Sequence, residues 1–271
     1  NDCAQYVESA PSGQPDCRRV TIVDGPTGAK RRTMFSIGAA INNRAANADM
    51  NETQNFQPPI VFDLDRDGEV EIVYAGVVFA LDGSPKWELP VATPHVAIGN
   101  LDDTPDIEVV VITKLPPFHR LGNLEAYKSD GTLLWRYPLS NGATNVFSNL
   151  TVADVDGDGF ADVLFPYYDY GLAIDMLLAV GHDGRLKWLA AGPATAPNAA
   201  LSARSRVAVF DVDGDGVPEV IKQHPDALHF LNGVDGTVKA SVPFGQLGDL
   251  GGSMSVPSVA DLDGDGRAEV V

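Results

Sequence analysis

The sequence is poor in several of the features that announce a function. Its 271 residues include two cysteines and five histidines, with 19 basic side chains against 37 acidic ones. The net charge of −18 argues against nucleic acid as a partner, because the phosphates would be repelled. No apolar run approaches the roughly 18 residues that cross a bilayer, so no membrane insertion is expected. No Ser/His/Asp or Cys/His signature is present, so we predict no catalytic residues and no enzyme.

What the sequence does contain is an acidic motif, repeated five times between β-branched, apolar segments. The motif begins at Asp63, Asn100, Asp154, Asp211 and Asp261, at intervals of 37, 54, 57 and 50 residues. A spacing of about 50 residues is typical of a four-stranded propeller blade.

A second element follows each of the first four motifs and has the pattern of a β-hairpin. It reads FALDGSPKW (79–87), AYKSDGTLLW (126–135), AVGHDGRLKW (179–188) and LNGVDGTVKA (231–240). Asp-Gly is a strong hairpin signal, and we expect both turn positions to have positive φ. Trp87, Trp135, Trp188 and Ala240 all lie four residues after the turn glycine. We interpret the tryptophans as residues that pack the blades.

We therefore predict an all-β fold: a β-propeller of four-stranded blades with five recognisable blade units. Residues 1–57 form an N-terminal segment, and residues 58–271 hold the repeats, within one domain overall. A hairpin at 20–38 matches the other hairpins and is expected to complete the last blade and close the ring. Two alternatives stay open, namely that the chain is the first part of a longer ring or that its N-terminal strands are donated to a neighbour. A short helix is expected near 39–48.

Four of the motifs follow the pattern D-x-D-x-D-G-x-x-D/E, which predicts a cation-binding loop. Side-chain oxygens occupy positions 1, 3, 5 and 9, a backbone carbonyl is expected from position 7, and Gly at position 6 permits a sharp turn. Ca²⁺ accepts such an oxygen set, whereas zinc and copper prefer nitrogen and sulfur. An EF-hand is excluded, because it needs a Glu at position 12 and flanking helices. We predict about four structural Ca²⁺ ions, held by Asp63, Asp65, Asp67, Glu69, Glu71; Asp154, Asp156, Asp158, Phe160, Asp162; Asp211, Asp213, Asp215, Val217, Glu219; and Asp261, Asp263, Asp265, Arg267, Glu269.

The second motif departs from this pattern. It offers Asn100, Asp102, Thr104 and Glu108, with Pro105 in place of the glycine. The motif has fewer charges and a stiffer turn, so we expect weak cation binding or none.

The repeats over 58–271, together with the hairpin at 20–38, resemble the FG-GAP/VCBS-type calcium-binding repeats of β-propellers. That group includes the head domains of integrin α-subunits. The Phe-Gly and Gly-Ala-Pro pieces that flank the integrin motif are missing, so the likeness is closer to bacterial secreted repeats. The resemblance implies that each acidic loop joins the first two strands of a blade and binds Ca²⁺.

The N-terminal part carries further signals of an extracellular protein. Cys3 and Cys17 are expected to form a disulfide, which implies an oxidising compartment. Asn51 and Asn149 begin glycosylation sequons. We thus expect a secreted or cell-surface binding or adhesion module for a protein or glycan, with the aromatic run at 167–170 as one candidate contact. The alternatives are a homo-oligomeric or filament subunit of an extracellular assembly and a Ca²⁺-dependent polysaccharide lyase.

Overall fold

The computed structural model describes residues 17–37, 58–89, 95–115, 120–139, 143–144, 150–169, 172, 174–191, 207–224, 227–243, 258–262 and 268–270. Every regular element within these ranges is a β-strand, which confirms the predicted all-β class. Over the same ranges, no helix has the length and apolar character to span a membrane. The expected helix near 39–48, Cys3 and both sequon asparagines lie outside the described residues.

The strands form four antiparallel sheets and two flanking strand pairs. Sheet 1 contains β3 (Ile60–Phe62), β4 (Glu71–Tyr74), β5 (Val77–Phe79) and β6 (Pro85–Glu88). Sheet 2 contains β7 (Val96–Gly99), β8 (Glu108–Leu115), β9 (Arg120–Tyr127) and β10 (Leu133–Pro138). Sheet 3 contains β11 (Ala143–Thr144), β12 (Thr151–Ala153), β13 (Asp162–Asp169), β14 (Ile174–Val180) and β15 (Leu186–Ala191). Sheet 4 contains β16 (Val207–Phe210), β17 (Glu219–Gln223), β18 (Ala227–Asn232) and β19 (Val238–Pro243). The flanking pairs are β1 (Cys17–Val23) with β2 (Lys30–Ile37) and β20 (Val259–Ala260) with β21 (Glu269–Val270).

The strands of sheets 1, 2 and 4 pair in chain order, as the repeated pattern predicts. The acidic loop lies between the first and second strands, and the Asp-Gly hairpin joins the third to the fourth. Sheet 3 departs slightly, since β11 and β12 both pair with β13. All the acidic loops and all the hairpin turns consequently lie at the same end of their sheets.

Consecutive sheets stack face to face, and the second strand of a sheet shows why its sequence is apolar without alternation. Along β8, Val109 and Val111 join the core shared with sheet 1. Val110 and Ile112 join the core shared with sheet 3. All four are fully buried, because side chains of successive residues point to opposite faces and both faces are covered.

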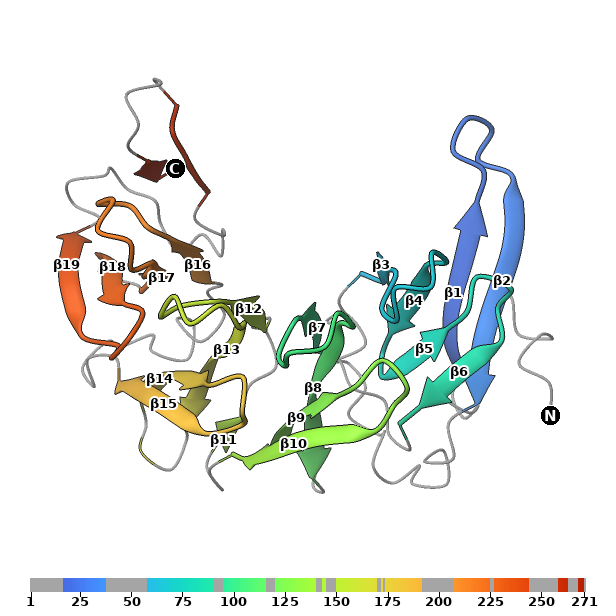
Figure 1. Ribbon diagram of the computed structural model, residues 1–271, viewed down its shortest axis with the longest axis horizontal. Helices are drawn as coiled ribbons and strands as arrows, with labels where there is room; N and C mark the ends of the chain where they lie inside the picture. The colour runs from blue at the N-terminus through green and yellow to red at the C-terminus, as the bar shows by residue number, and fades with distance from the viewer. Residues whose placement is uncertain are drawn as a thin grey trace.

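The stacked sheets follow an open arc in Figure 1, with β1–β2 at one end and β20–β21 at the other. The hairpin β1–β2 lies against sheet 1, where Ile22 packs beside Ile72, Val77 and Phe79. The expectation that this hairpin completes the last sheet is therefore wrong in this structure. Local patterns identify the hairpin correctly, but they do not fix how far each sheet rotates from the previous one, and ring closure depends on that rotation.

The hairpin turns also differ from the expectation that both turn positions have positive φ. Gly83, Gly131, Gly184 and Gly236 have φ between 71° and 88°, whereas the preceding aspartates do not have positive φ. A register shift follows in each hairpin, as between Val78 and Phe79. This combination is a turn with a left-handed glycine and a bulge, and the aspartate stabilises it by accepting a backbone N–H, as Asp82 does from Ser84 at 2.8 Å.

The three tryptophans join each sheet to the next one, which confirms their interpretation as packing residues. Trp135 Nε1 donates to the carbonyl of His182 at 2.7 Å, in the hairpin of the following sheet. The indole lies against Gly184, where any Cβ would come within 2.7 Å of the ring. The other two repeat this arrangement: Trp87 donates to Ser129 O at 2.8 Å and Trp188 to Gly233 O at 2.7 Å. Arg32 takes the equivalent place in the first hairpin and contacts the carbonyl of Asp82.

Candidate metal sites

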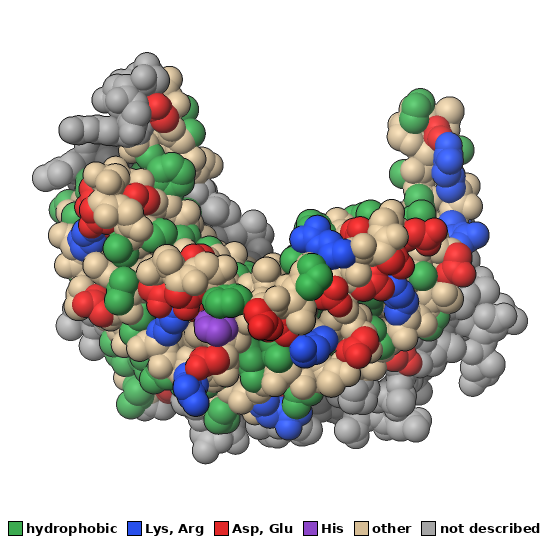
Figure 2. All heavy atoms as spheres, in the orientation of Figure 1, with side chains coloured by type: hydrophobic (Ala, Val, Ile, Leu, Met, Phe, Trp, Pro, Cys, Tyr) green, Lys and Arg blue, Asp and Glu red, His purple; other side chains and the backbone are tan. Residues whose placement is uncertain are grey.

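We number the acidic loops by sheet: loop 1 (63–71), loop 2 (100–108), loop 3 (154–162), loop 4 (211–219) and loop 5 (261–269). Figure 2 shows acidic side chains gathered in patches on this face of the arc, with basic side chains close beside them. The repeat of the sheet therefore repeats the loops along one side of the molecule.

Loops 1, 3 and 4 wrap around the carboxylate at position 1. In loop 3, Asp154 accepts the backbone N–H groups of Gly157 at 2.7 Å and Gly159 at 2.9 Å. Gly68, Gly159 and Gly216 at position 6 have φ of 93°, 92° and 88°, so the sharp turn predicted there is confirmed. The wrapped backbone turns the side chains of positions 1, 3 and 9 toward one centre.

The carboxylate at position 9 closes each loop. Its oxygen accepts the backbone N–H of position 2 in all five loops: Leu64 N to Glu71 at 2.9 Å, Leu101 N to Glu108 at 2.7 Å, Val155 N to Asp162 at 3.3 Å, Val212 N to Glu219 at 2.9 Å and Leu262 N to Glu269 at 2.7 Å. This bond holds the two ends of the loop together, and in loops 1 and 4 the second oxygen of the same carboxylate accepts a hydrogen bond from a lysine.

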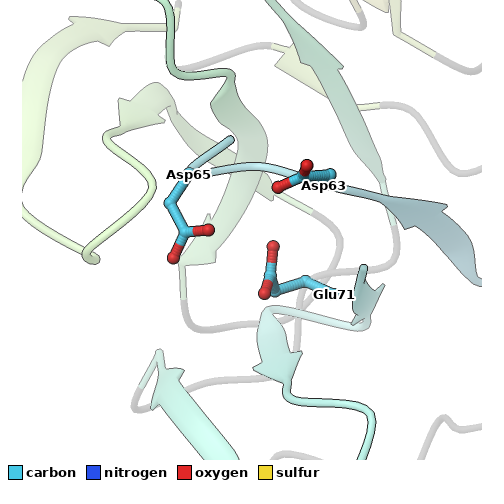
Figure 3. A group of neighbouring side chains, drawn as sticks. All are labelled: Asp63, Asp65 and Glu71. Atoms are coloured by element: carbon cyan, nitrogen blue, oxygen red, sulfur yellow. The ribbon is translucent and has the colours of Figure 1, made fainter. Parts of the chain in front are cut away.

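Among the described residues, three groups of carboxylates could hold a metal ion. They are Asp63, Asp65 and Glu71; Asp154, Asp156 and Asp162; and Asp211, Asp213 and Glu219. Within each group, one oxygen from each side chain lies within 4.8 Å of the others. Figure 3 shows the carboxylates of the first group pointing toward one another from the loop and from the start of β4. Positions 1, 3 and 9 of the predicted ligand sets thus come together in all three loops.

Several of these oxygens are buried and have no hydrogen-bond partner, which indicates a missing positive charge. Asp63, Asp65, Asp156 and Asp162 each have an Oδ1 in this condition. Asp162 is completely buried, and burial raises the pKa of its carboxyl group even though Lys187 lies nearby. An unpaired buried carboxylate oxygen is costly, so the geometry and the oxygen-only donor set fit a hard divalent cation.

Lysine side chains reach into the same three groups, and the sequence analysis missed them. Lys86 Nζ lies 2.7 Å from Asp65 and 2.7 Å from Glu71. Lys187 contacts Asp156 and lies 2.8 Å from Asp162. Each lysine comes from the last strand of its own sheet and partly neutralises the loop.

The remaining lysine, Lys239, lies within 3.0 Å of three carboxylates, those of Asp213, Asp215 and Glu219. The hydrogen bond with Asp213 makes the largest contribution to raising the pKa of Lys239, and the bond with Asp65 does the same for Lys86. Burial acts against the charged form of Lys187, but its bonds to Asp156 and Asp162 still raise its pKa. All three ammonium groups are therefore charged at neutral pH.

The signal for these lysines is present in the hairpins as D-G-x-x-K. Lys86, Lys187 and Lys239 each lie three residues after the turn glycine, directly before the tryptophan or alanine. The second hairpin has Leu134 at this position. The lysine is thus found in the sheets whose loops have the full set of acids, and absent from the sheet whose loop does not.

Loop 2 forms no comparable carboxylate group among the described residues. Asp102 accepts the backbone N–H of Thr104 at 2.8 Å, and its other oxygen lies 2.9 Å from Lys128. Glu108 is fully buried with Oε1 unpartnered, and burial raises the pKa of its carboxyl group. Asn100 has an exposed side chain, and no carboxylate replaces it at position 1.

The other predicted ligands have different places. The position 5 carboxylates of Asp67, Asp158 and Asp215 lie outside the three groups and accept the N–H of Glu69, Phe160 and Val217 at 2.8, 2.9 and 2.8 Å. These bonds shape the turn from which the position 7 carbonyls are expected to bind. Of loop 5, Asp261 and Glu269 are described, while Asp263, Asp265 and Arg267 lie outside the described residues.

Two further expectations can be placed. Cys17 begins β1, but the Cys3–Cys17 disulfide lies outside the described residues. Tyr167, proposed as a recognition residue, is instead buried and stacks on Phe165 with ring centroids 5.9 Å apart. It belongs to the core because it continues the apolar run of β13.

Comparison with known proteins supports the fold. No protein-family model matches the chain, and no curated protein gives a significant match. The V. cholerae biofilm matrix protein Bap1 is similar with a TM-score of 0.51 and 14% identity, over 79% of this chain and 59% of that one. The Bacillus licheniformis rhamnogalacturonan lyase PL11 is similar with a TM-score of 0.54 and 18% identity, over 93% of this chain and 48% of that one. The chain spans about half to three-fifths of the length of these structures. The likeness shows a β-propeller-like all-β fold.

Proposed function

We propose that the chain forms consecutive blades of a Ca²⁺-stabilised β-propeller of the FG-GAP/VCBS type. The observation that carries this proposal is the completely buried Asp162, whose Oδ1 has no hydrogen-bond partner and whose carboxylate has an oxygen within 4.8 Å of oxygens of Asp154 and Asp156. Loops 1, 3 and 4 would each hold one ion through positions 1, 3 and 9. The bound ion supplies positive charge where the carboxylates converge, and it stabilises the junction between the first two strands of the sheet.

The role of such ions would be structural. Each acidic group lies at the end of a sheet and is closed by its own backbone hydrogen bonds, so the ion would stiffen the fold. We infer a binding or adhesion module that is secreted or exposed at a cell surface, where calcium is abundant enough for millimolar sites. The partner that we propose is a protein or a glycan. The similarity to a biofilm matrix protein and to a rhamnogalacturonan lyase supports including glycans.

A lyase is the second candidate, favoured by the similarity to the rhamnogalacturonan lyase fold. Such an enzyme would need a basic residue that accepts a proton beside the cation. The lysines next to loops 1, 3 and 4 do not suit that role, because the carboxylates raise their pKa values and keep them protonated. Incubation with uronic-acid polymers, followed by the absorbance of unsaturated products, would separate the lyase from the binding module.

Assembly is the third candidate, and the positions of the two end pairs favour it. The pairs β1–β2 and β20–β21 lie at opposite ends of the arc and do not complete one sheet together (Figure 1). Solution mass with and without residues 1–57 tests this role. Loss of an oligomer on truncation would support strand donation, and an unchanged monomer would oppose it.

The calcium role is tested by thermal melting and calorimetry on chelator-treated protein. Added Ca²⁺ should raise the melting temperature, and Asp162→Asn should remove one bound ion. Asp102→Asn in loop 2 is the matched control and should leave the number of ions unchanged. A melting temperature that does not respond to Ca²⁺ would overturn the proposal.

A further inference from the structure

Lys86, Lys187 and Lys239 use the carboxylates that would bind a metal ion. Lys86 Nζ is 2.7 Å from both Asp65 and Glu71, which are two of the three members of the loop 1 group. Lys239 Nζ is 2.8 Å from Asp213 and 2.6 Å from Glu219, the corresponding pair in loop 4. An ammonium group and a divalent cation therefore share two of three carboxylates in each loop.

The lysine does not neutralise all of the negative charge of its loop. With Lys187 in place, Asp156 and Asp162 each still have a buried Oδ1 without a partner. One positive charge faces three carboxylates, so the loop remains attractive to a cation. The lysine lowers this attraction without abolishing it.

The repeats indicate that the pairing is a property of the site and not a general surface contact. The lysine position is kept before Trp87, Trp188 and Ala240, in sheets with three converging carboxylates. It is Leu134 in sheet 2, whose loop lacks them. A lysine that served solubility alone would not be expected to occur at this position only in the hairpins of sheets whose acidic loops have three converging carboxylates.

We propose that these three lysines are internal counter-ions that set the affinity of loops 1, 3 and 4 for calcium. This inference rests on the calcium role proposed above. Without calcium, the ammonium group neutralises part of the carboxylate charge and keeps the loop folded. When calcium binds, the ammonium group is repelled, and its displacement weakens the apparent affinity.

The side chains have room for this displacement. The exposed fractions of the Lys86, Lys187 and Lys239 side chains are 32%, 17% and 27%, so each has solvent beside it. A lysine can keep its aliphatic stem on the strand and turn the ammonium group to water. The affinity of the loop then reflects both the acids that attract calcium and the lysine that competes with it.

The test is calcium calorimetry on full-length, chelator-treated Lys187→Met. One class of sites should bind calcium about tenfold more tightly than in the unchanged protein, because a positive charge a few ångströms from the ion is gone. The chelator-treated variant should also melt at a lower temperature. Lys187→Gln keeps a polar end without the charge and should show the same tightening if the methionine variant fails to fold.

Arg185→Gln is the matched control. The side chain of Arg185 lies in the same hairpin, is 87% exposed and pairs at 3.3 Å with Asp183, which is not a member of the carboxylate group. It should change neither calcium affinity nor metal-free melting.

The outcomes separate the two proposals. If the unchanged protein binds calcium and both Lys187 variants bind it equally or more weakly, the counter-ion role is overturned and the calcium role stands. If the unchanged protein and every variant bind no calcium, the calcium role itself is overturned and the counter-ion role with it.

Discussion

Loops 2 and 3 occupy equivalent places in neighbouring sheets, and their differences separate what the fold needs from what a cation needs. Both use the position 9 carboxylate to hold the N–H of position 2, through Glu108 and Asp162. The two loops are joined by a backbone bond from Ala161 N to Asn100 O at 2.9 Å. Loop 2 thus keeps the closure and the contact with its neighbour without the converging acids. Loop 2 has Asn100 and Thr104 at positions 1 and 5, so the acids at these two positions of loop 3 are not required to form the strand connection.

The turn in the middle of the loops marks the second difference. Loop 3 has Gly157 and Gly159 at φ of 77° and 92°. Loop 2 has Asp103 and Pro105 at these positions. Proline fixes φ near −65°, so loop 2 cannot wrap around its first residue as loop 3 does.

The largest expected effect on stability comes from replacing the position 1 side chain by alanine, which we compare between loops 2 and 3. Asp154→Ala loses the bonds to Gly157 and Gly159 and a cation ligand, so we expect it to lower stability in calcium by about 3 kcal/mol and to remove one ion. Asn100→Ala should change stability by less than about 0.5 kcal/mol, because the side chain is exposed. Denaturant unfolding with and without calcium measures both. Equal losses in the two variants would contradict the division between the loops.

A somewhat smaller effect on stability is expected from giving loop 2 the acidic and glycine residues of loop 3. The combined change Asn100→Asp, Thr104→Asp and Pro105→Gly supplies the missing carboxylates and the flexible turn. The variant should bind one additional calcium ion and gain about 2.7 kcal/mol of stability when calcium is one hundred times above the dissociation constant. The same variant should be less stable than the unchanged protein in chelator, because the new carboxylates repel one another. An unchanged ion count would show that the acids and the glycine are not sufficient.

The smallest effect concerns the buried carboxylate that loop 2 retains. Burial raises the pKa of Glu108 in the folded chain, so the folded state holds this proton more tightly than the unfolded state does. The resulting stabilisation is present below the unfolded pKa of about 4.3 and is lost as the pH rises through the folded pKa. Glu108→Gln cannot lose a proton, so in chelator its stability relative to the unchanged protein should improve modestly from pH 4 to pH 7.

Urea unfolding at several pH values measures this difference, and Asn100→Ala serves as the control. If the advantage of the Glu108→Gln variant instead shrinks as the pH rises, Glu108 is stabilised in its charged form. Because the glutamine side chain keeps an oxygen for the N–H of Leu101, the comparison isolates the charge.

Much of the fold could be predicted from the sequence because the decisive signals are local. Asp63, Asp65 and Glu71 meet because a nine-residue loop with a left-handed Gly68 can bring them together in few ways. The tryptophan register predicted a packing role, since Trp87, Trp135 and Trp188 recur at one position of the hairpin. Both signals depend on short stretches of chain.

The sequence analysis missed the lysines and expected a ring closure that the structure does not show, for different reasons. Lys86 lies on an outer strand where a charged residue is ordinarily assigned to solvent, and only the fold shows that this strand passes its own acidic loop. Closure of the ring depends on the rotation between sheets, which accumulates over the whole arc. The sequence pattern of a single repeat does not determine it. The buried position of Tyr167 was missed because an aromatic run near a turn looks the same in a loop as at the end of a covered strand.

The indole-to-carbonyl bonds have a consequence for how such a chain can change in length. Sheets 1, 2 and 3 each carry a donor on one side, such as Trp135, and an acceptor on the other, such as the Ser129 carbonyl, whereas sheet 4 has Ala240 at the donor position. Duplication or loss of one whole unit therefore leaves each remaining junction with its indole donor and its carbonyl acceptor. Insertion of part of a unit would separate a donor from its acceptor. We therefore expect related chains to differ in length by whole repeat units.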